Sequence, residues 1–159
     1  MANKLWGSGL IAAIVFLMAT NGAFRAGGPG DDKKSLWDRL GGEKNVAKVV
    51  ADFQKAAGAD PKVNASRDGK FKLDEAGKKE RTRLIVEFIS SVTGGPLKYS
   101  GRGMKDSHKG LAISNAEFDA AAAHFKAALE KNSVAPADVA EALKIWNGTR
   151  KDIVKGNNK

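Results

Sequence analysis

Apolar residues recur at helical spacing along most of this chain, and glycine or proline interrupts the pattern at intervals. The first long stripe consists of Val46, Val49, Val50, Phe53 and Ala57. A second consists of Leu84, Ile85, Phe88, Ile89 and Val92, and the run Gly94-Gly95-Pro96 ends it. The strict alternation that marks β-strands is not found. We therefore expect an all-α domain of about five to seven helices.

Capping residues predict where the helices begin. Ser35 is placed to cap a short helix at 36–40, which Gly41 ends. Ser114 and Glu117 have the spacing of a capping box, and they open a helix with an apolar face. The last helix carries apolar residues at helical spacing, which are Val139, Leu143 and Trp146.

Composition limits the chemistry of this chain of 159 residues. It has no cysteine, which excludes disulfides, zinc ribbons, iron–sulfur clusters and covalent c-type haem attachment. Its histidines are His108 and His124. The formal charge is +9, but the lysines stand beside acidic residues, as in solvated helix faces. We therefore expect no nucleic-acid partner.

The N-terminal part differs in composition from the rest. No residue from Leu5 to Phe24 is charged. This uncharged run is long enough to cross a membrane as a helix. Residues 1–26 are therefore predicted to be a signal peptide or a membrane anchor, followed by a linker at 27–34 and a folded domain at 35–159. The expected location is extracytoplasmic, on the periplasmic side. The protein is membrane-anchored if this hydrophobic helix is retained, and secreted if it is cleaved.

The segment 64–75, NASRDGKFKLDE, matches the spacing of a twelve-residue calcium loop. Only Asp68 and Glu75 would supply negative charge as ligands, whereas Arg67, Lys70 and Lys72 add positive charge. Because calcium affinity depends on ligand charge, such a site would be weak. The alternative interpretation is a glycine-centred turn before the next helix.

The two histidines have different surroundings in the sequence. His124 lies within a helix and is predicted to be packed or half-exposed there. His108 lies on a short helical piece between Gly103 and Gly110, with Met104 one turn earlier. An imidazole beside an apolar residue on such a piece is one way in which proteins hold haem iron.

Several segments, in order, resemble those of the group 1 truncated haemoglobins. They are SLWDRLGG at 35–42, VVADF at 49–53, ADP at 59–61, VEFISSVTGGP at 86–96, YSGRGMKDSHKGL at 99–111, ISNAEFDAAAAHF at 113–125 and RKDIV at 150–154. The resemblance implies a two-over-two globin-like helical sandwich around haem b (iron protoporphyrin IX). It also implies that His108 is the proximal iron ligand.

The resemblance implies further pocket residues. Phe53, Phe88 and Phe71 match the pocket aromatics, and Met104 matches the apolar residue packed under the haem. The chain departs from the family at Gln54, where a tyrosine usually donates to bound oxygen. An amide N–H can still donate there.

On the distal helix, Arg81 and Ile85 take the two positions that face the ligand, and the family often has glutamine at the second. Leu84 stands where some members have a sixth iron ligand, so we expect none here, or only water. Cations for the haem propionates are expected from Arg81, Arg102 and Lys105.

The implied function is the binding of O₂, NO or CO at an open iron site. NO dioxygenation would be an enzymatic use of such a site, and it requires a reductase as partner. The alternative function is that of an accessory, membrane-anchored globin-fold subunit with a structural or docking role in a larger membrane complex. A calcium-binding module is a third possibility.

Overall fold

The computed structural model describes residues 34–155, which form seven helices and no sheet. The helices are α1 (Leu36–Arg39), α2 (Gly42–Ala59), α3 (Glu75–Thr93), α4 (Met104–Ser107), α5 (Asn115–Lys131), α6 (Pro136–Gly148) and α7 (Arg150–Ile153). The predicted hydrophobic N-terminal helix and residues 27–33 of the predicted linker lie outside the described residues. No helix among residues 34–155 combines the length and the apolar character needed to cross a membrane.

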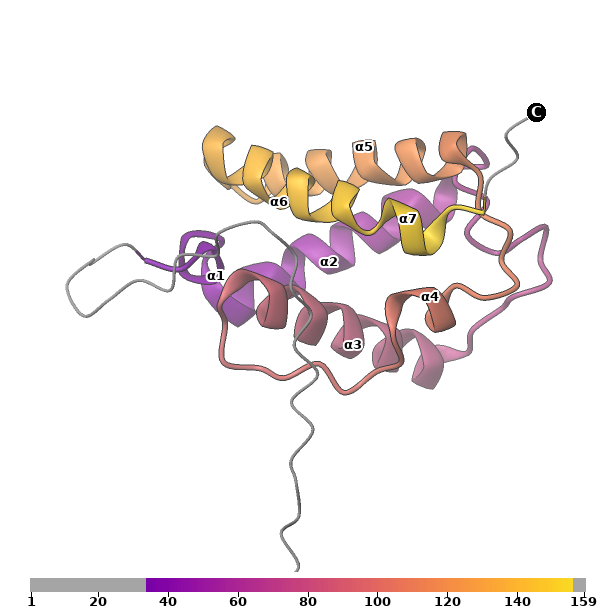
Figure 1. Ribbon diagram of the computed structural model, residues 1–159, viewed down its shortest axis with the longest axis horizontal. Helices are drawn as coiled ribbons and strands as arrows, with labels where there is room; N and C mark the ends of the chain where they lie inside the picture. Colours follow the sequence, from indigo (N-terminus) through magenta and orange to yellow (C-terminus); the bar gives the residue numbers. More distant parts are fainter. Residues whose placement is uncertain (1–33, 156–159) are drawn as a thin grey trace, which may run out of the picture. The chain divides into compact units, whose positions relative to one another are not determined.

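Helix α2 is the centre of the arrangement (Figure 1). It packs against α5 on one side and α3 on the other, and α6 packs against α5. The pairs α2–α3 and α5–α6 thus form two layers, as expected for a two-over-two helical sandwich. Helix α1 contacts both α2 and α3, and α4 contacts α7.

The predicted helix boundaries are confirmed at three places. Ser35 and Asp38 form a capping box at α1, and Ser114 and Glu117 form one at α5. Helix α3 ends at Gly94, whose φ of +83° is costly for any residue with a side chain.

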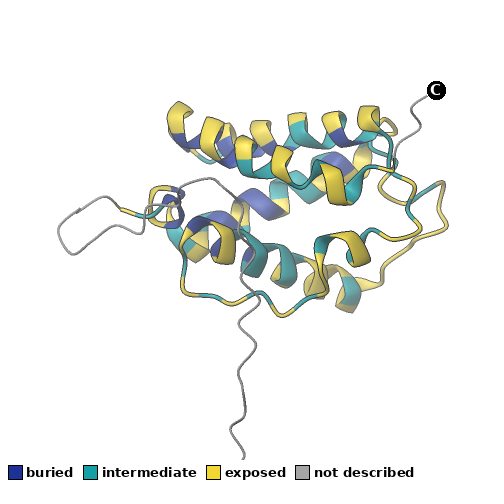
Figure 2. Cartoon of the chain, viewed as in Figure 1, coloured by how far each residue is buried: buried dark blue, intermediate teal, exposed yellow. Residues whose placement is uncertain are grey.

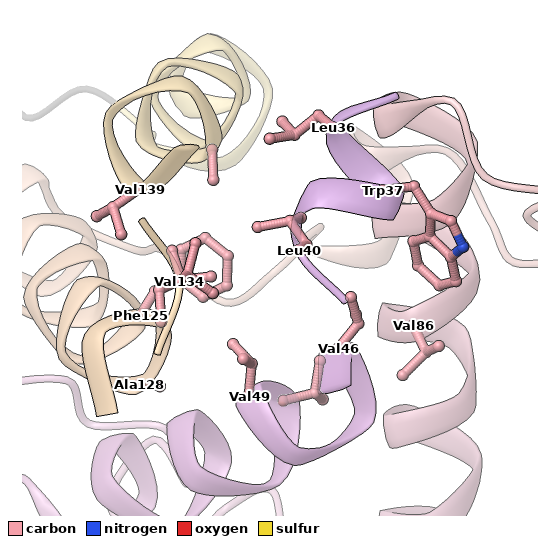
Figure 3. Close-up of a cluster of buried hydrophobic side chains, with 13 residues drawn as sticks. Leu36, Trp37, Leu40, Val46, Val49, Val86, Phe125, Ala128, Val134 and Val139 are labelled. Atoms are coloured by element: carbon pink, nitrogen blue, oxygen red, sulfur yellow. The ribbon is translucent and has the colours of Figure 1, made fainter. Parts of the chain in front are cut away.

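The core lies between α1, the first half of α2, α3, α5 and α6 (Figure 3). The predicted stripe of α2 is confirmed, since its valines are at most 2% exposed and Val50 is fully buried. Members of this core cluster from the other elements include Leu36, Leu40, Phe125, Leu129 and Val139. In Figure 2 the buried segments of α2 and α5 face one another, whereas α4 has no buried residue.

The buried face of α3 differs from the predicted one. The structure buries Val86, Ser90 and Thr93, whereas the predicted Val92 is 41% exposed. The polar pair can be buried because the backbone satisfies both hydroxyl groups. Ser90 Oγ accepts from the N–H of Leu97 at 2.9 Å, and Thr93 Oγ1 donates to the carbonyl of Ile89 at 2.6 Å.

The C-terminal segment also goes beyond the prediction. After α6 the chain forms the separate short helix α7, and Val154 then makes an isolated parallel bridge with Ile113. The N–H of Lys155 donates to the carbonyl of Ile113 at 3.1 Å. This contact joins the end of the described chain to the connection between α4 and α5.

Candidate functional site

His108 stands at the C-terminal end of α4, which begins one turn earlier at Met104. Its Nδ1 lies 2.8 Å from the carbonyl oxygen of Met104. Because a carbonyl oxygen only accepts, Nδ1 carries the hydrogen, and in the neutral imidazole Nε2 therefore has the lone pair. A histidine fixed in this way can offer Nε2 to a metal, and its orientation is set by its own helix.

His124 is used differently. Its Nε2 donates to Oδ2 of Asp60 at 2.8 Å, which ties the middle of α5 to the residue that ends α2. This hydrogen bond is the main reason why the pKa of Asp60 lies below its ordinary value. The prediction of a half-exposed helix histidine is confirmed, since 28% of the side chain is exposed.

Gln54 lies on α2 with its amide directed at the α2–α3 contact. Its Oε1 accepts from Oγ1 of Thr82 at 3.1 Å. Its Nε2 is buried and has no hydrogen-bond partner among the described residues. A buried N–H without an acceptor is costly, and it indicates a place where a ligand or water would supply one. Thr82 was not predicted as a site residue, because a threonine within a polar helical turn gives no signal of this tertiary contact.

Phe53 belongs to an aromatic cluster between α2, α5 and α6. Its ring packs edge-on against Phe125 at 5.9 Å and Trp146 at 5.4 Å between centroids. The indole Nε1 of Trp146 is also buried without a partner among residues 34–155. Trp146 was predicted only as an apolar helix residue, and its indole N–H is the signal that this prediction missed.

Ile85 and Phe88 are half-buried on α3. Ile85 packs against the core cluster, and Phe88 packs edge-on against Tyr99 at 5.6 Å between centroids. Met104 is half-buried on α4 and supplies the carbonyl that holds His108. Apolar side chains from two helices are thus only partly covered by the protein.

Phe71 is 52% exposed, and the neighbouring Leu73 is 43% exposed. They are the most exposed large hydrophobic residues that the structure describes, and both lie in the segment between α2 and α3. The structure does not bring Phe71 into contact with the aromatic cluster around Phe53. Its place in a haem pocket stays a prediction.

The three predicted cations are exposed. Arg81 makes no ion pair with the described part of the chain. Enough protein atoms surround its guanidinium that desolvation lowers its pKa, although the residue as a whole is exposed. The carbonyl of Arg102 accepts from Tyr99 Oη at 2.8 Å, and Lys105 lies on α4 next to Met104.

The segment 64–75 uses its oxygens for its own backbone. Asn64 Oδ1 accepts from the N–H of Asp68 at 2.9 Å, and Ser66 Oγ accepts from that of Gly69 at 3.2 Å. Arg67 pairs with Glu117 on α5 at 2.6 Å. No group of three or more acidic, histidine or cysteine side chains within residues 34–155 could hold a metal ion. The calcium interpretation therefore gains no support.

The residues present fit a haem. One histidine offers Nε2 from a short helix, a buried amide has an N–H without an acceptor, and half-buried apolar side chains lie on α2, α3 and α4. Basic side chains on α3 and α4 are exposed to meet carboxylates.

Comparison with known proteins agrees with this fit. The family model described as bacterial-like globin matches residues 35–155. A group 1 truncated haemoglobin of Tetrahymena pyriformis is 31% identical over 121 residues, which cover 76% of this chain and 95% of that protein. One of Nostoc sp. (strain MUN 8820) is 31% identical over 109 residues, which cover 69% and 87%.

A solved structure supports the same conclusion. The crystal structure of the truncated haemoglobin from Tetrahymena pyriformis in its Fe(III) form has a TM-score of 0.67 and 29% sequence identity. The match covers 77% of this chain and all of that one. The chain described here therefore belongs to the group 1 truncated haemoglobins, which are globins that bind haem and diatomic gases.

Proposed function

We propose that His108 would hold haem b through Nε2, and that the haem would bind a diatomic gas beside Gln54. The observation that carries the proposal is the hydrogen bond between His108 Nδ1 and the Met104 carbonyl, at 2.8 Å. It fixes the tautomer that leaves Nε2 as a base. Haem iron with one axial histidine supplies an open coordination position for O₂, NO or CO.

The other residues of the site bind, orient and exclude water. The half-buried side chains of Phe53, Ile85, Phe88 and Met104 provide an apolar lining. Arg81, Arg102 and Lys105 provide cations for the two carboxylates of the haem. Leu84 cannot coordinate a metal, so the gas-binding face stays open to a ligand.

The absorption spectrum of ferric, ferrous and CO-treated protein tests the proposal. We expect a Soret band that persists through purification and shifts with CO. His108→Ala should lose it, whereas His124→Ala should keep it, because His124 Nε2 is already bound to Asp60. A folded helical protein that takes up no haem would contradict the proposal and favour a docking subunit instead.

We also propose that residues 1–26 export or tether this globin, with the folded domain beginning at residue 35. The uncharged run from Leu5 to Phe24 supports this. Mass spectrometry of the purified protein would show whether the leader is cleaved, and alkaline extraction of membranes would show whether it anchors. Intact protein that remains in the cytoplasmic fraction would contradict both.

A further inference from the structure

We propose that Thr82 is a positioning residue of the gas-binding site, because its hydroxyl group can anchor either end of the Gln54 amide and so lets the ligand select which end faces it. This inference rests on the proposed function, since it assumes that a gas binds beside Gln54. It concerns a residue on α3 that acts only through its neighbour on α2.

The geometry gives the Thr82 hydroxyl two acceptors. Its Oγ1 lies 3.1 Å from Oε1 of Gln54 and 2.9 Å from the carbonyl oxygen of Lys78. A hydroxyl group has one hydrogen, so it cannot donate fully to both. The Lys78 carbonyl lies inside α3 and also accepts a helical hydrogen bond, whereas the Gln54 amide has no other partner among the described residues.

In the first orientation, which has the heavy-atom arrangement of the structure, Thr82 donates to Gln54 Oε1 at 3.1 Å. The Nε2 group then turns away from Thr82 and has no acceptor in the described chain. A gas ligand with a lone pair on its outer atom would accept from it. Without such a ligand, the buried N–H is left unpaired at a cost in free energy.

In the second orientation, the amide has turned by half a turn, which exchanges its oxygen and nitrogen. Nε2 now donates to Thr82 Oγ1, and the hydroxyl donates to the Lys78 carbonyl. The one hydroxyl hydrogen and one of the two amide hydrogens are then both used in hydrogen bonds. Oε1 then faces the site. An unpaired carbonyl oxygen is tolerated better than an unpaired N–H, and it suits a donor such as water.

The ligand therefore selects the orientation, because each ligand interacts better with one of the two. An accepting gas such as O₂ selects the N–H orientation, and a donating water selects the C=O orientation. Thr82 permits both by switching its hydrogen between Gln54 and Lys78. Without the hydroxyl group, the amide has no anchor in either orientation.

The C–O stretching frequency of the ferrous CO form reads the amide orientation directly. An N–H directed at the ligand lowers this frequency, and a carbonyl lone pair raises it. We expect two bands in the unmodified full-length protein. Thr82→Val keeps the shape of the side chain but removes the hydroxyl, and it should replace both bands by one. Oxygen dissociation should become roughly three- to tenfold faster, as for the loss of one hydrogen bond.

Three further variants make the result decisive. Gln54→Leu should give a single band that marks a site without the amide. Thr82→Ser retains the hydroxyl and should restore both bands. Thr93→Val is the matched control, because Thr93 also donates to a carbonyl of α3, that of Ile89 at 2.6 Å, and has no bond to Gln54. It should leave both bands unchanged.

The outcomes separate this inference from the proposed function. If Thr82→Val keeps the bands of the unmodified protein, or that protein shows one band only, the inference is overturned. If no CO form can be made, the proposed function fails. The Thr82–Gln54 contact is then tested in the haem-free protein. There, Thr82→Val and Gln54→Leu should shift the urea midpoint non-additively when they are combined. Additive shifts would overturn the contact itself.

Discussion

The two ends of α2 lie in different surroundings. At its first turns, the core end, Val46, Val49 and Val50 are buried against α1, α5 and α6. At its last turns, the site end, Phe53 and Gln54 are half-buried, and the amide of Gln54 has an N–H without a partner in the described chain. Side chains cover the core end almost completely, whereas the site end keeps half-buried side chains and an unpaired polar group.

Haem binding should produce the largest difference between the two ends. A ligand that binds only the folded form adds about 4 kcal/mol to the free energy of unfolding at roughly a thousandfold excess over its Kd. Urea unfolding of the haem-free and haem-loaded protein measures this gain. His108→Ala should abolish it, and a gain that survives this substitution would show that the site end is completed in another way.

Leu129→Ala should affect the core end alone. Leu129 is 1% exposed on α5, and removing its side chain should lower the free energy of unfolding by about 3 kcal/mol with and without haem. The Soret and CO spectra should not change. A spectral shift would mean that the two ends are not mechanically separate.

Arg67→Met should loosen the site end moderately. The Arg67–Glu117 pair has side chains only 16% and 17% exposed, and Arg67 Nη2 also donates to the carbonyl of Ala112 at 3.3 Å. Losing these bonds should lower the free energy of unfolding by about 1–2 kcal/mol and speed haem loss.

Lys126→Met is the matched control for this change. Lys126 forms an exposed pair with Glu130 on the same helix that carries Glu117, and such pairs contribute little. Equal effects of the two substitutions on haem loss would show that the Arg67 bridge has no special role at the site.

Acid should weaken the hydrogen bonds of two carboxylates, Glu87 on α3 and Glu117 at the start of α5. Hydrogen bonds from Ser100 lower the pKa of Glu87, and those from Ser114 and Arg67 lower the pKa of Glu117 although its burial acts in the opposite direction. Because the folded pKa lies below the unfolded one, this stability is present above about pH 4.3 and is lost as the pH falls further. Urea midpoints measured across this range should fall, and less steeply in Glu117→Gln. A midpoint that rises on acidification would be inconsistent with these pKa shifts.

Trp146→Phe should give the smallest effect. The change keeps a ring against Phe53 and Phe125 but removes the buried indole N–H that has no partner among the described residues. The lost contact area and the removed unpaired donor offset each other, so the free energy of unfolding of the haem-free protein should change by less than about 1 kcal/mol. A much larger loss would show that the indole N–H has a partner.

The sequence predicts the helices well where a local signal exists. Ser35, Ser114 and Gly94 act on backbone groups within one turn, so their capping roles could be predicted without the fold. The buried face of α3 could not, because Ser90 and Thr93 are buried only through bonds to backbone groups that the fold and helix supply.

The site follows the same rule. His108 could be singled out by its short helix, its neighbouring glycines and the family resemblance together, and its role as iron ligand stays a prediction. That Nδ1, and not Nε2, binds the Met104 carbonyl could be learned only from the structure. The contact between Thr82 and Gln54 joins residues 28 positions apart on different helices, and no sequence pattern announces it.

The parallel bridge between Ile113 and Val154 connects the carboxyl-terminal segment to the chain that follows His108. The bridge holds the segment 109–113, which follows His108, and α7 packs against α4. Proteolytic trimming back to residue 149 would therefore free the segment that follows His108 while α1, α2, α3, α5 and α6 remained intact.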